Sequence, residues 1–494
     1  MEPGIPEFFK NKTVFLTGGS GFLGKVATEK LLRTTEVKRI YSLIRPKRGV
    51  SIEGRTSAWE KDPIFEVLLQ AQPKALQRVT PIAGDCLEPD LGISEKDRKL
   101  LVNEVQVVIH GAATVRFDEA MHLSLAINVR ATRLMLQLAK QMSQLVAFVH
   151  ISTAYSNCVL TDIDERFYPE NLKDDSDTIL ALSELLSDET LDSMTSTLVG
   201  SYPNTYTYTK ALAEDVIRRE SGDLPICIFR PAIVMPTYKD PLLGWADNLF
   251  GPLALIYGGA RGIVRVVMAY NHVKIAVVPA DYCANLTLAC AWELGVKSKK
   301  ETPPIYTLAP TETNHITYGS FIELLVVNRD NTPLSHMIWY PYILLVSPYL
   351  FPLATIFYHK IPGYFFDTLL RLTGRKPILT KLYQKVHKNI EVVRLFTTTT
   401  FNFGMTNTQR LLNTLTERDR SSYDFDMHRV DWNEYLRLCI DGIRRYIAKD
   451  PKNPESLAKA LKLKDRLKYL HYAHALSLGI AVSYAVWTLV KLFI

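Results

Sequence analysis

A tyrosine and a lysine four residues apart form the pair in this sequence best suited to proton transfer. They are Tyr206 and Lys210, and on a helix this spacing places both side chains on one face. A neighbouring ammonium favours the phenolate and lowers the pKa of a tyrosine, so the phenol becomes a usable proton donor near neutral pH. The nearby Tyr208 should face elsewhere and pack in the core. Because such a pair is common on protein surfaces, its meaning depends on the elements around it.

Two adjacent hydroxyl side chains, Ser152 and Thr153, follow a short apolar run at residues 147–151. This run is typical of a buried strand, and it is the fifth such strand, each earlier one being followed by a helical pattern. Strands that alternate with helices predict a parallel, doubly wound sheet, whose ligands bind beyond the carboxyl ends of the strands. Either hydroxyl is therefore suited to donate a second hydrogen bond to an oxygen that Tyr206 protonates.

The glycine-rich stretch at residues 13–25 predicts a dinucleotide-binding turn. An apolar strand leads into Gly18, Gly21 and Gly24, and helical periodicity follows. Gly18 permits the tight turn, Gly21 lets the backbone approach a pyrophosphate, and Gly24 lets the helix pack closely. The first N–H groups of that helix attract phosphate. The three-residue glycine spacing is typical of short-chain dehydrogenase/reductases; the alternative is a glycine-rich turn without a ligand.

Basic residues at the end of the second strand indicate which dinucleotide is bound. Residues 39–48 are expected to form that strand, which ends in the basic cluster of Arg45, Lys47 and Arg48. Arginine at this place accommodates the 2′-phosphate, so NADPH is favoured over NAD, although a solvated basic loop is the alternative. The expected cofactor-binding residues are Thr17, Gly18, Ser20, Gly21, Phe22, Leu23, Gly24, Arg45, Asp85, Cys86, Ala112, Ala113, Tyr206, Lys210 and Pro231.

Length and composition describe an ordered, cytosol-facing protein of several parts. The 494 residues exceed one compact core, and the net charge of +7 suits anionic cofactors or a membrane surface. No nucleic-acid-binding module and no metal-ligand pattern is visible, and the six cysteines lack a disulfide framework. We expect a Rossmann domain at 1–295, with an insertion or lid at 161–200, a connecting region at 296–358, a helical domain at 359–448, and a basic segment with a tail anchor at 449–494.

Two apolar stretches bear on membrane attachment. Residues 472–490 lack Asp, Glu, Lys and Arg, which suits a span of the hydrocarbon core, and basic residues precede them. This charge bias predicts a single-pass C-terminal anchor with the catalytic domain facing the cytosol. We expect the endoplasmic reticulum in preference to the peroxisome, although tail anchors with basic flanks serve both. Residues 337–358 are also uncharged, but three prolines interrupt them, so a membrane-dipping or substrate-tunnel surface is favoured over a span.

Several of these motifs together resemble one family. They are residues 8–25, 84–92, 110–119, 150–157, 202–214 and 230–234. The sequence resembles the eukaryotic, insect-type fatty acyl-CoA reductases, which belong to the extended short-chain dehydrogenase/reductase superfamily and are related to the male-sterility proteins of plants. The resemblance covers essentially the whole chain, since the helical region and its apolar tail are similar to the family's C-terminal domain.

The resemblance implies a reaction and a role for each residue. Such enzymes reduce a long-chain acyl-CoA to the primary alcohol with two NADPH, by way of an aldehyde. Tyr206 would donate to the carbonyl oxygen, while Lys210 lowers its pKa and holds the ribose hydroxyls. Thr153 would be the second donor, with Ser152 as the alternative. Asn128 would anchor a water that relays protons to Lys210.

Three other functions share part of this pattern. A thioester reductase that stops at the aldehyde consumes one NADPH. A membrane-bound sterol-type enzyme oxidises an alcohol with NAD, against which Arg45 and the helical domain speak. A non-catalytic scaffold would be expected to have lost Thr153, Tyr206 or Lys210, and all three are present.

Overall fold

The structure is a computed structural model that describes residues 3–47, 49–297, 301–451 and 453–493. The chain divides into two compact units, each assembled from three segments. The first consists of Met1–Leu243, Lys274–Ile316 and Thr399–Val430, and the second of Gly244–Val273, Thr317–Thr398 and Asp431–Ile494. The expected contiguous segments therefore do not correspond to these units. The expected boundary after residue 295 includes residues 298–300, which lie outside the described ranges.

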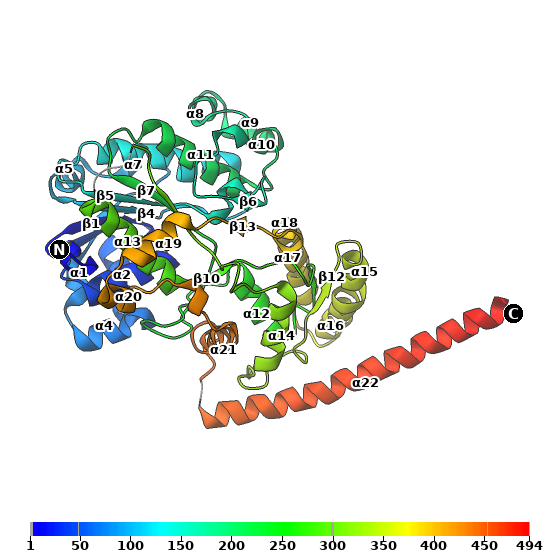
Figure 1. The fold of residues 1–494 in the computed structure, drawn as a ribbon. Coiled ribbons are helices and arrows are strands. Elements are labelled where there is room, and N and C mark those ends of the chain that lie inside the picture. The colour runs from blue at the N-terminus through cyan, green and yellow to red at the C-terminus, as the bar shows by residue number, and fades with distance from the viewer. Residues whose placement is uncertain (1–2, 48, 298–300, 452, 494) are drawn as a thin grey trace. The chain divides into compact units, whose positions relative to one another are not determined.

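A parallel sheet of seven strands forms the centre of the first unit, counted over the residues that the structure describes (Figure 1). Its order, β11-β7-β5-β4-β1-β2-β3, reverses direction between β1 and β4, which makes the ends of these two strands the switch point where ligands bind. The doubly wound Rossmann sheet is thus confirmed. The strands are β1 (Thr13–Thr17), β2 (Arg39–Ile44), β3 (Val79–Ala83), β4 (Val107–His110), β5 (Ala147–Ile151), β7 (Ile226–Pro231) and β11 (Ile305–Leu308).

Helices cover both faces of this sheet (Figure 1). On one face α2 (Phe22–Thr34) packs against α13 (Ala280–Val296), whose side chains are buried along almost its whole length. On the other face α5 (Glu95–Glu104), α7 (Ala131–Ala139) and α11 (Thr205–Glu220) share one apolar core with the sheet. Strands buried on both faces explain why β4 and β5 are apolar runs without alternation.

The segment expected to be an insertion or lid is folded against the first unit's core. It contains α8 (Ser176–Leu185), α9 (Asp188–Ser193) and α10 (Thr195–Val199). Ile179, Leu180 and Leu191 of these helices are buried in the same core as α7 and α11.

Three short strand pairs are also present in the described residues: β6 (Asp162–Ile163) with β13 (Asn402–Phe403), β8 (Ile233–Met235) with β10 (Val277–Pro279), and β9 (Val266–Met268) with β12 (Leu344–Val346).

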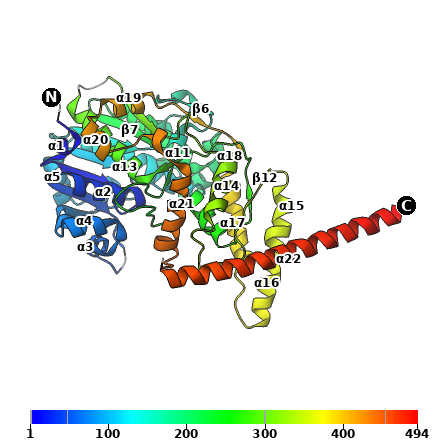
Figure 2. The same ribbon diagram turned by 60° about the horizontal axis from the view of Figure 1, so that its bottom comes forward.

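The second unit is mainly helical (Figure 2). Residues 337–358 form no single helix, since they contain a loop, β12 and a short helix that begins beside Pro352. A helical hairpin follows, made of α15 (Phe351–Thr355), the π-helical turn Ile356–Lys360, α16 (Ile361–Leu372) and α17 (Leu379–Val392). Further helices of this unit are α12 (Pro252–Ala260), α14 (Tyr318–Asn328), α18 (Arg394–Thr398) and α21 (Trp432–Gly442).

The expected helical domain at 359–448 is shared between the units, because α19 (Thr406–Thr414) and α20 (Glu417–Ser422) belong to the first. The last helix, α22 (Pro454–Phe493), begins packed on the second unit through Leu467 and an ion pair of 3.0 Å between Lys464 and Asp330. The expected membrane span at 472–490 is not confirmed: within the described ranges, no helix combines the length and apolar character needed to cross a bilayer.

Candidate active site

The glycine-rich turn joins β1 to α2 at the switch point of the sheet. Gly18 has φ +76°, and a Cβ there would lie 2.8 Å from backbone atoms of Gly111 and Ala112. A Cβ on Gly24 would lie 2.2 Å from the carbonyl oxygen of Gly18, so α2 rests directly on the turn. Gly21 precedes α2 and is exposed, leaving the first N–H groups of the helix accessible. This glycine cradle fits the pyrophosphate of a dinucleotide.

The other predicted residues of the turn divide into accessible and buried ones. Ser20, Phe22 and Leu23 are partly exposed. Thr17 is buried, and its Oγ1 lies 2.7 Å from Nδ1 of His110 and accepts the Ala112 N–H at 3.2 Å. The Thr17 side chain thus joins the ends of β1 and β4 and supports the floor of the site.

The basic group at the end of β2 is present and partly paired. Arg45 is exposed, and its Nε lies 3.0 Å from Oδ2 of Asp85, the carboxylate expected to reach the adenine. Arg55 of α3 (Ile52–Ser57) donates to the backbone carbonyl of Arg45, so its guanidinium also lies at the end of β2. Lys47 is exposed, whereas Arg48 lies outside the described residues. Arginines gathered at the end of this strand suit a 2′-phosphate.

Two expected cofactor contacts lie deeper than this surface. Cys86 is buried, and burial raises the pKa of its thiol to about 11, so it packs as a neutral side chain. Pro231 ends β7 and is paired in register with Leu308 of β11. Both are therefore part of the fold around the site.

Asn128 fixes the segment that follows β4. It lies in a π-helical turn at Leu125–Arg130, a distortion frequent at functional sites. Its Oδ1 accepts the Thr114 N–H at 3.0 Å, and its Nδ2 donates to Thr209 Oγ1 at 2.9 Å. These bonds hold the partly exposed Ala112 and Ala113 in place. Among the described residues no hydrogen bond links Asn128 to Lys210, so its predicted water relay stays a prediction.

Helix α11 carries the central pair of the site. Asn204 caps its first turn by accepting the Thr207 N–H at 2.9 Å, which fixes where the helix begins. Tyr206 and Lys210 follow on one face, as the spacing predicts. Tyr208 is buried with its ring 5.5 Å from that of Tyr202, which confirms its packing role.

The Tyr206 phenol meets Thr153 and an aromatic ring. Burial raises the pKa of Tyr206 to about 12, and a hydrogen bond with the Thr153 side chain opposes this rise. The ring of Phe117 stacks on Tyr206 at 5.7 Å between centroids. The expected lowering of the Tyr206 pKa by Lys210 is not found in the protein alone, because burial dominates and the Lys210 ammonium donates elsewhere.

Lys210 is buried at the end of β5. Its Nζ donates to the carbonyl oxygen of Ile151 at 2.8 Å. Burial lowers the pKa of Lys210 to about 8, opposed by the charge of Glu214. The charge of Lys210 also acts on two buried histidines, His110 and His150. Burial, and after it the Lys210 charge, lowers the pKa of His110 to about 3 and the pKa of His150 well below its usual value. Lys210 can therefore gain or lose a proton close to neutral pH, while both imidazoles stay neutral.

The two candidate hydroxyls have different partners. Ser152 Oγ donates to Oε1 of Glu214 at 2.6 Å. Glu214 also accepts two hydrogen bonds from the fully buried Arg230, at 2.9 and 2.5 Å. Thr153 instead hydrogen-bonds Tyr206. Thr153 is therefore a partner of the Tyr206 phenol, whereas Ser152 belongs to the buried network of Glu214 and Arg230.

Comparison with known proteins identifies the family. Residues 16–287 match a family model described as male sterility protein, and residues 358–450 match a second model with the same description. The chain is 40% identical over 489 residues to fatty acyl-CoA reductase wat of Drosophila melanogaster, covering 99% of this chain and 93% of that protein. It belongs to the fatty acyl-CoA reductase family. Fatty acyl-CoA reductase 1 of Xenopus laevis is 34% identical, covering 95% of this chain and 90% of the relative.

Solved structures with the same fold are known for more distant proteins. The terminal R domain of the myxalamid biosynthetic pathway has a TM-score of 0.58 at 19% identity, covering 88% of this chain and 91% of that chain. A reductase domain of a nonribosomal peptide synthetase from Mycobacterium tuberculosis has the same TM-score at 17% identity, covering 90% and 94%. At these identities the likeness concerns the fold of this reductase family member.

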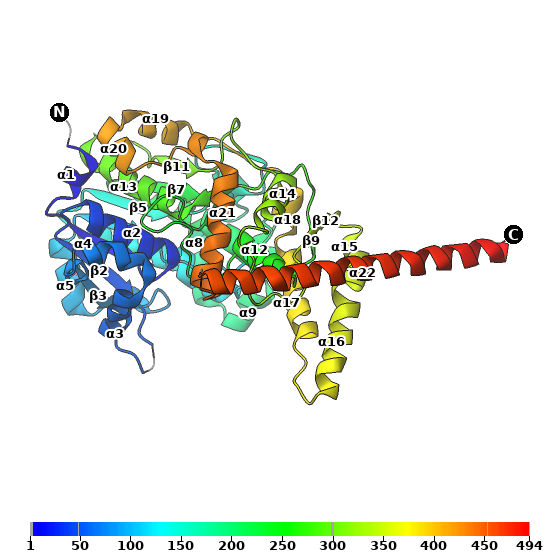
Figure 3. The same cartoon turned by 90° about the horizontal axis from the view of Figure 1, so that it is seen from below.

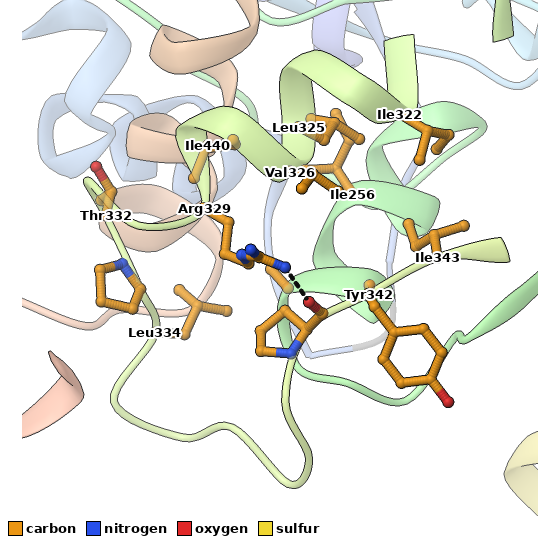
Figure 4. A pocket seen from close by; sticks show the side chains of 14 residues that line it. Ile256, Ile322, Leu325, Val326, Arg329, Thr332, Leu334, Tyr342, Ile343 and Ile440 are labelled. Atoms are coloured by element: carbon orange, nitrogen blue, oxygen red, sulfur yellow. Dashed lines mark hydrogen bonds between the residues drawn. The ribbon is translucent and has the colours of Figure 1, made fainter. Parts of the chain in front are cut away.

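The second unit of this family member holds an apolar pocket (Figure 4). Its volume of about 40 Å³ accommodates little more than a water molecule, so in this form it does not hold an acyl chain. Arg329 donates to the Pro341 carbonyl at 2.9 Å, across one side of the pocket. The labelled lining residues are Ile256, Ile322, Leu325, Val326, Arg329, Thr332, Leu334, Tyr342, Ile343 and Ile440.

Sequence reasoning missed four residues of the site. Glu214 follows Lys210 by four positions, so helical spacing was a usable signal. Arg230 lies inside an otherwise apolar strand, and a buried charge requires a partner. Phe117 and Arg55 reach the site through tertiary packing, for which the sequence offers no local signal.

Proposed function

We propose that this protein reduces long-chain fatty acyl-CoA to primary fatty alcohols. One acyl-CoA and two NADPH, with two protons, give one alcohol, free CoA and two NADP⁺. The observation that carries the proposal is the Thr153–Tyr206 hydroxyl pair at the end of β5, with Lys210 buried behind it. Membership of the family and the glycine cradle support the same activity.

Bound NADPH would supply hydride to the substrate carbonyl, and the residues of this chain manage the oxygen. When the thioester carbonyl is attacked, negative charge develops on its oxygen, and Tyr206 and Thr153 are placed to hydrogen-bond it. These donors stabilise charge best where water is excluded, and Phe117 stacked on Tyr206 shields that side of the phenol. Collapse of the tetrahedral species expels the CoA thiolate and leaves an aldehyde.

The second reduction needs a proton at the new alkoxide. Tyr206 donates it, and a phenol whose pKa is about 12 stays protonated until that strong base forms. After this donation the Tyr206 phenolate needs a proton. Lys210, whose pKa is about 8, can supply it at neutral pH. The same residues thus serve both reductions.

The proposed preference for NADPH is supported by Arg45 and Arg55. Both guanidinium groups lie at the end of β2, where a dinucleotide's ribose is bound in this fold. The 2′-phosphate of bound NADPH would compete with the Asp85 carboxylate for the Arg45 guanidinium. Asp85 would then be available to contact the adenine.

The test is turnover of palmitoyl-CoA and stearoyl-CoA by purified membranes, with NADPH consumption measured and lipid products identified by mass. Wild type should form fatty alcohol at two NADPH per acyl chain. Tyr206→Phe should abolish turnover, whereas Tyr208→Phe, on the same helix but in the core, should retain it. Aldehyde at one NADPH would contradict the four-electron reaction, and turnover by Tyr206→Phe would contradict the assigned donor.

We also propose that the C-terminal helix attaches the protein to a membrane, with the catalytic unit in the cytosol, at the endoplasmic reticulum in preference to the peroxisome. Large apolar side chains on the last part of α22 support this proposal, since Leu476, Ile480, Tyr484 and Trp487 are each at least half exposed. A lipid phase would cover them, and it also holds the fatty substrate and product.

Carbonate extraction of cell membranes tests the attachment. Wild type should remain in the pellet, while Leu476→Lys combined with Ile480→Lys should move the protein to the supernatant. The matched control is Leu185→Lys, at an exposed leucine of the first unit. Extraction of the wild type, or retention of the double variant, would contradict the proposal, and digestion of the catalytic unit in intact vesicles would test its orientation.

A further inference from the structure

Helices α15 and α16, joined by the π-helical turn, form one helical stretch of the second unit (Figure 3), and an apolar ridge of side chains runs along it. Leu353, Phe357, Ile361, Phe365 and Leu369 follow one another at four-residue intervals, and each exposes between 42 and 60% of its surface. Side chains at this spacing form a continuous ridge on a helix, here about 24 Å long at 1.5 Å per residue. Soluble surfaces rarely expose so many large apolar side chains together.

The opposite side of this helix is firmly packed, so the exposure of the ridge is built into the fold. Gly363 allows α16 to approach α17 closely, since a Cβ there would lie 3.0 Å from the Tyr383 ring. The carboxylate of Asp367 is buried and caps α17 by accepting the N–H groups of Ile378, Leu379 and Thr380, each at 2.9 Å.

A second contact holds the base of the hairpin. His359 Nδ1 lies 2.9 Å from Nε2 of His387, which joins the π-helical turn to α17. The His359 ring also stacks on Tyr383 at 4.6 Å. With one side of the helix engaged in this way, the ridge points away from the hairpin's own core.

The charges of the hairpin are mostly positive. Between residues 351 and 392 the sequence has seven lysines and arginines and two acidic residues, the buried Asp367 and the exposed Glu391 near the end of α17. All seven cations are exposed. They are Lys360, Arg371, Arg375, Lys376, Lys381, Lys385 and Lys388.

We propose that this hairpin, residues 351–392, is a membrane-binding surface for anionic lipid. The apolar ridge enters the boundary between headgroups and acyl chains, and the exposed lysines and arginines contact lipid phosphates and carboxylates. A second copy of the chain is a poor occupant, because two such surfaces would bring like charges together. The surface is separate from the attachment proposed for α22 and from the reduction chemistry.

Depth-dependent fluorescence on the full-length protein tests the proposal. The six native cysteines are all buried, so a cysteine introduced at an exposed position can be labelled selectively with an environment-sensitive dye. The probe position is Phe365→Cys on the ridge, and the matched control is Glu434→Cys, exposed on α21 of the same unit. Each labelled protein is mixed with vesicles of phosphatidylcholine, with or without phosphatidylserine, that contain a spin-labelled quencher lipid.

The expected result is a blue shift and quenching at Phe365 in phosphatidylserine vesicles, with neither at Glu434. Replacing Arg371, Arg375 and Lys376 by glutamine should abolish the requirement for phosphatidylserine together with most of the quenching. Binding of the protein to vesicles without a blue shift or quenching of the dye at position 365 would overturn the proposed membrane contact of the hairpin. That result would not contradict the α22 attachment or the enzyme activity. Equal quenching in vesicles of phosphatidylcholine alone would overturn the preference for anionic lipid. A blue shift that appears without vesicles as the protein concentration rises would overturn the proposal in favour of self-association.

Discussion

Replacing Glu214 by glutamine is expected to damage both the stability and the pH profile of the enzyme. The carboxylate is buried and joins Arg230 and Ser152 through three hydrogen bonds. In the variant the charge and one of the two acceptor oxygens are lost, while Arg230 keeps its two backbone acceptors, the carbonyl oxygens of Asp164 and Arg166. Breaking one partner of a buried ion pair costs about 3–5 kcal/mol, a large part of the 5–15 kcal/mol that stabilises a typical domain. For a unit of this size the expected fall in Tm is about 6–20 °C.

The pH effect follows from the charge that Glu214 contributes beside Lys210. That charge raises the pKa of Lys210 against the effect of burial, so its loss lowers the pKa further below about 8. If protonated Lys210 is required, the fall in kcat on the alkaline side moves to lower pH in Glu214→Gln. Thermal unfolding in detergent and kcat between pH 6 and pH 9 measure the two effects, with the exposed Glu184→Gln as control. A Tm within 2 °C of wild type together with an unchanged pH profile would refute the reasoning.

Three further substitutions test other parts of the structure. Gly24→Ala should raise the Kd for NADPH at least tenfold in a fluorescence titration, because its Cβ would overlap backbone atoms of the turn. Gly479→Ala, which has open space around it, should bind NADPH as wild type does. Equal NADPH affinity of Gly24→Ala and wild type would contradict the cradle. Thr153→Val should lower kcat about 10²–10³-fold. Ser152→Ala should mainly lower the free energy of unfolding, by about 1–3 kcal/mol. A loss of kcat in Ser152→Ala and of stability in Thr153→Val would exchange the two roles. Because the pKa of His150 lies well below 6.5 in the folded protein, the unfolded state takes up its proton first, and stability should fall as pH drops below 6.5, by up to about 1.4 kcal/mol per pH unit. Unfolding scans from pH 8 to pH 5 measure this slope, which His150→Phe should reduce while the contribution of His110 remains. An unchanged slope would show that His150 does not contribute.

Local patterns were sufficient for most of the central sheet. Strands β1, β2 and β5 are short apolar runs bounded by turns or helices, and each was expected where the structure has it. The seventh, β11, was missed because Ile305–Leu308 is short and follows a charged, proline-containing stretch that is typical of a boundary. The division into interleaved units was also missed, because contacts between segments hundreds of residues apart leave no local trace.

The active site shows the same limit. The order of Tyr206 and Lys210 on one helix follows from spacing alone, and the glycine turn follows from residue type. Which of Ser152 and Thr153 faces the tyrosine depends on Glu214 and Arg230, whose side chains meet only in the folded protein. The direction of the Tyr206 pKa shift also depended on burial, which the sequence does not measure.

The interleaving of the first unit sets an order of events during synthesis. Thr399–Val430 belongs with β1, yet it leaves the ribosome nearly 400 residues later, a delay of about 20–80 s at 5–20 residues per second. Before β11 is made, β7 is also without its last neighbour, and an unpaired edge invites misassociation. The apolar ridge of α15–α16 emerges before the catalytic unit is finished. A nascent chain of this protein therefore presents apolar surface while its active site is still incomplete.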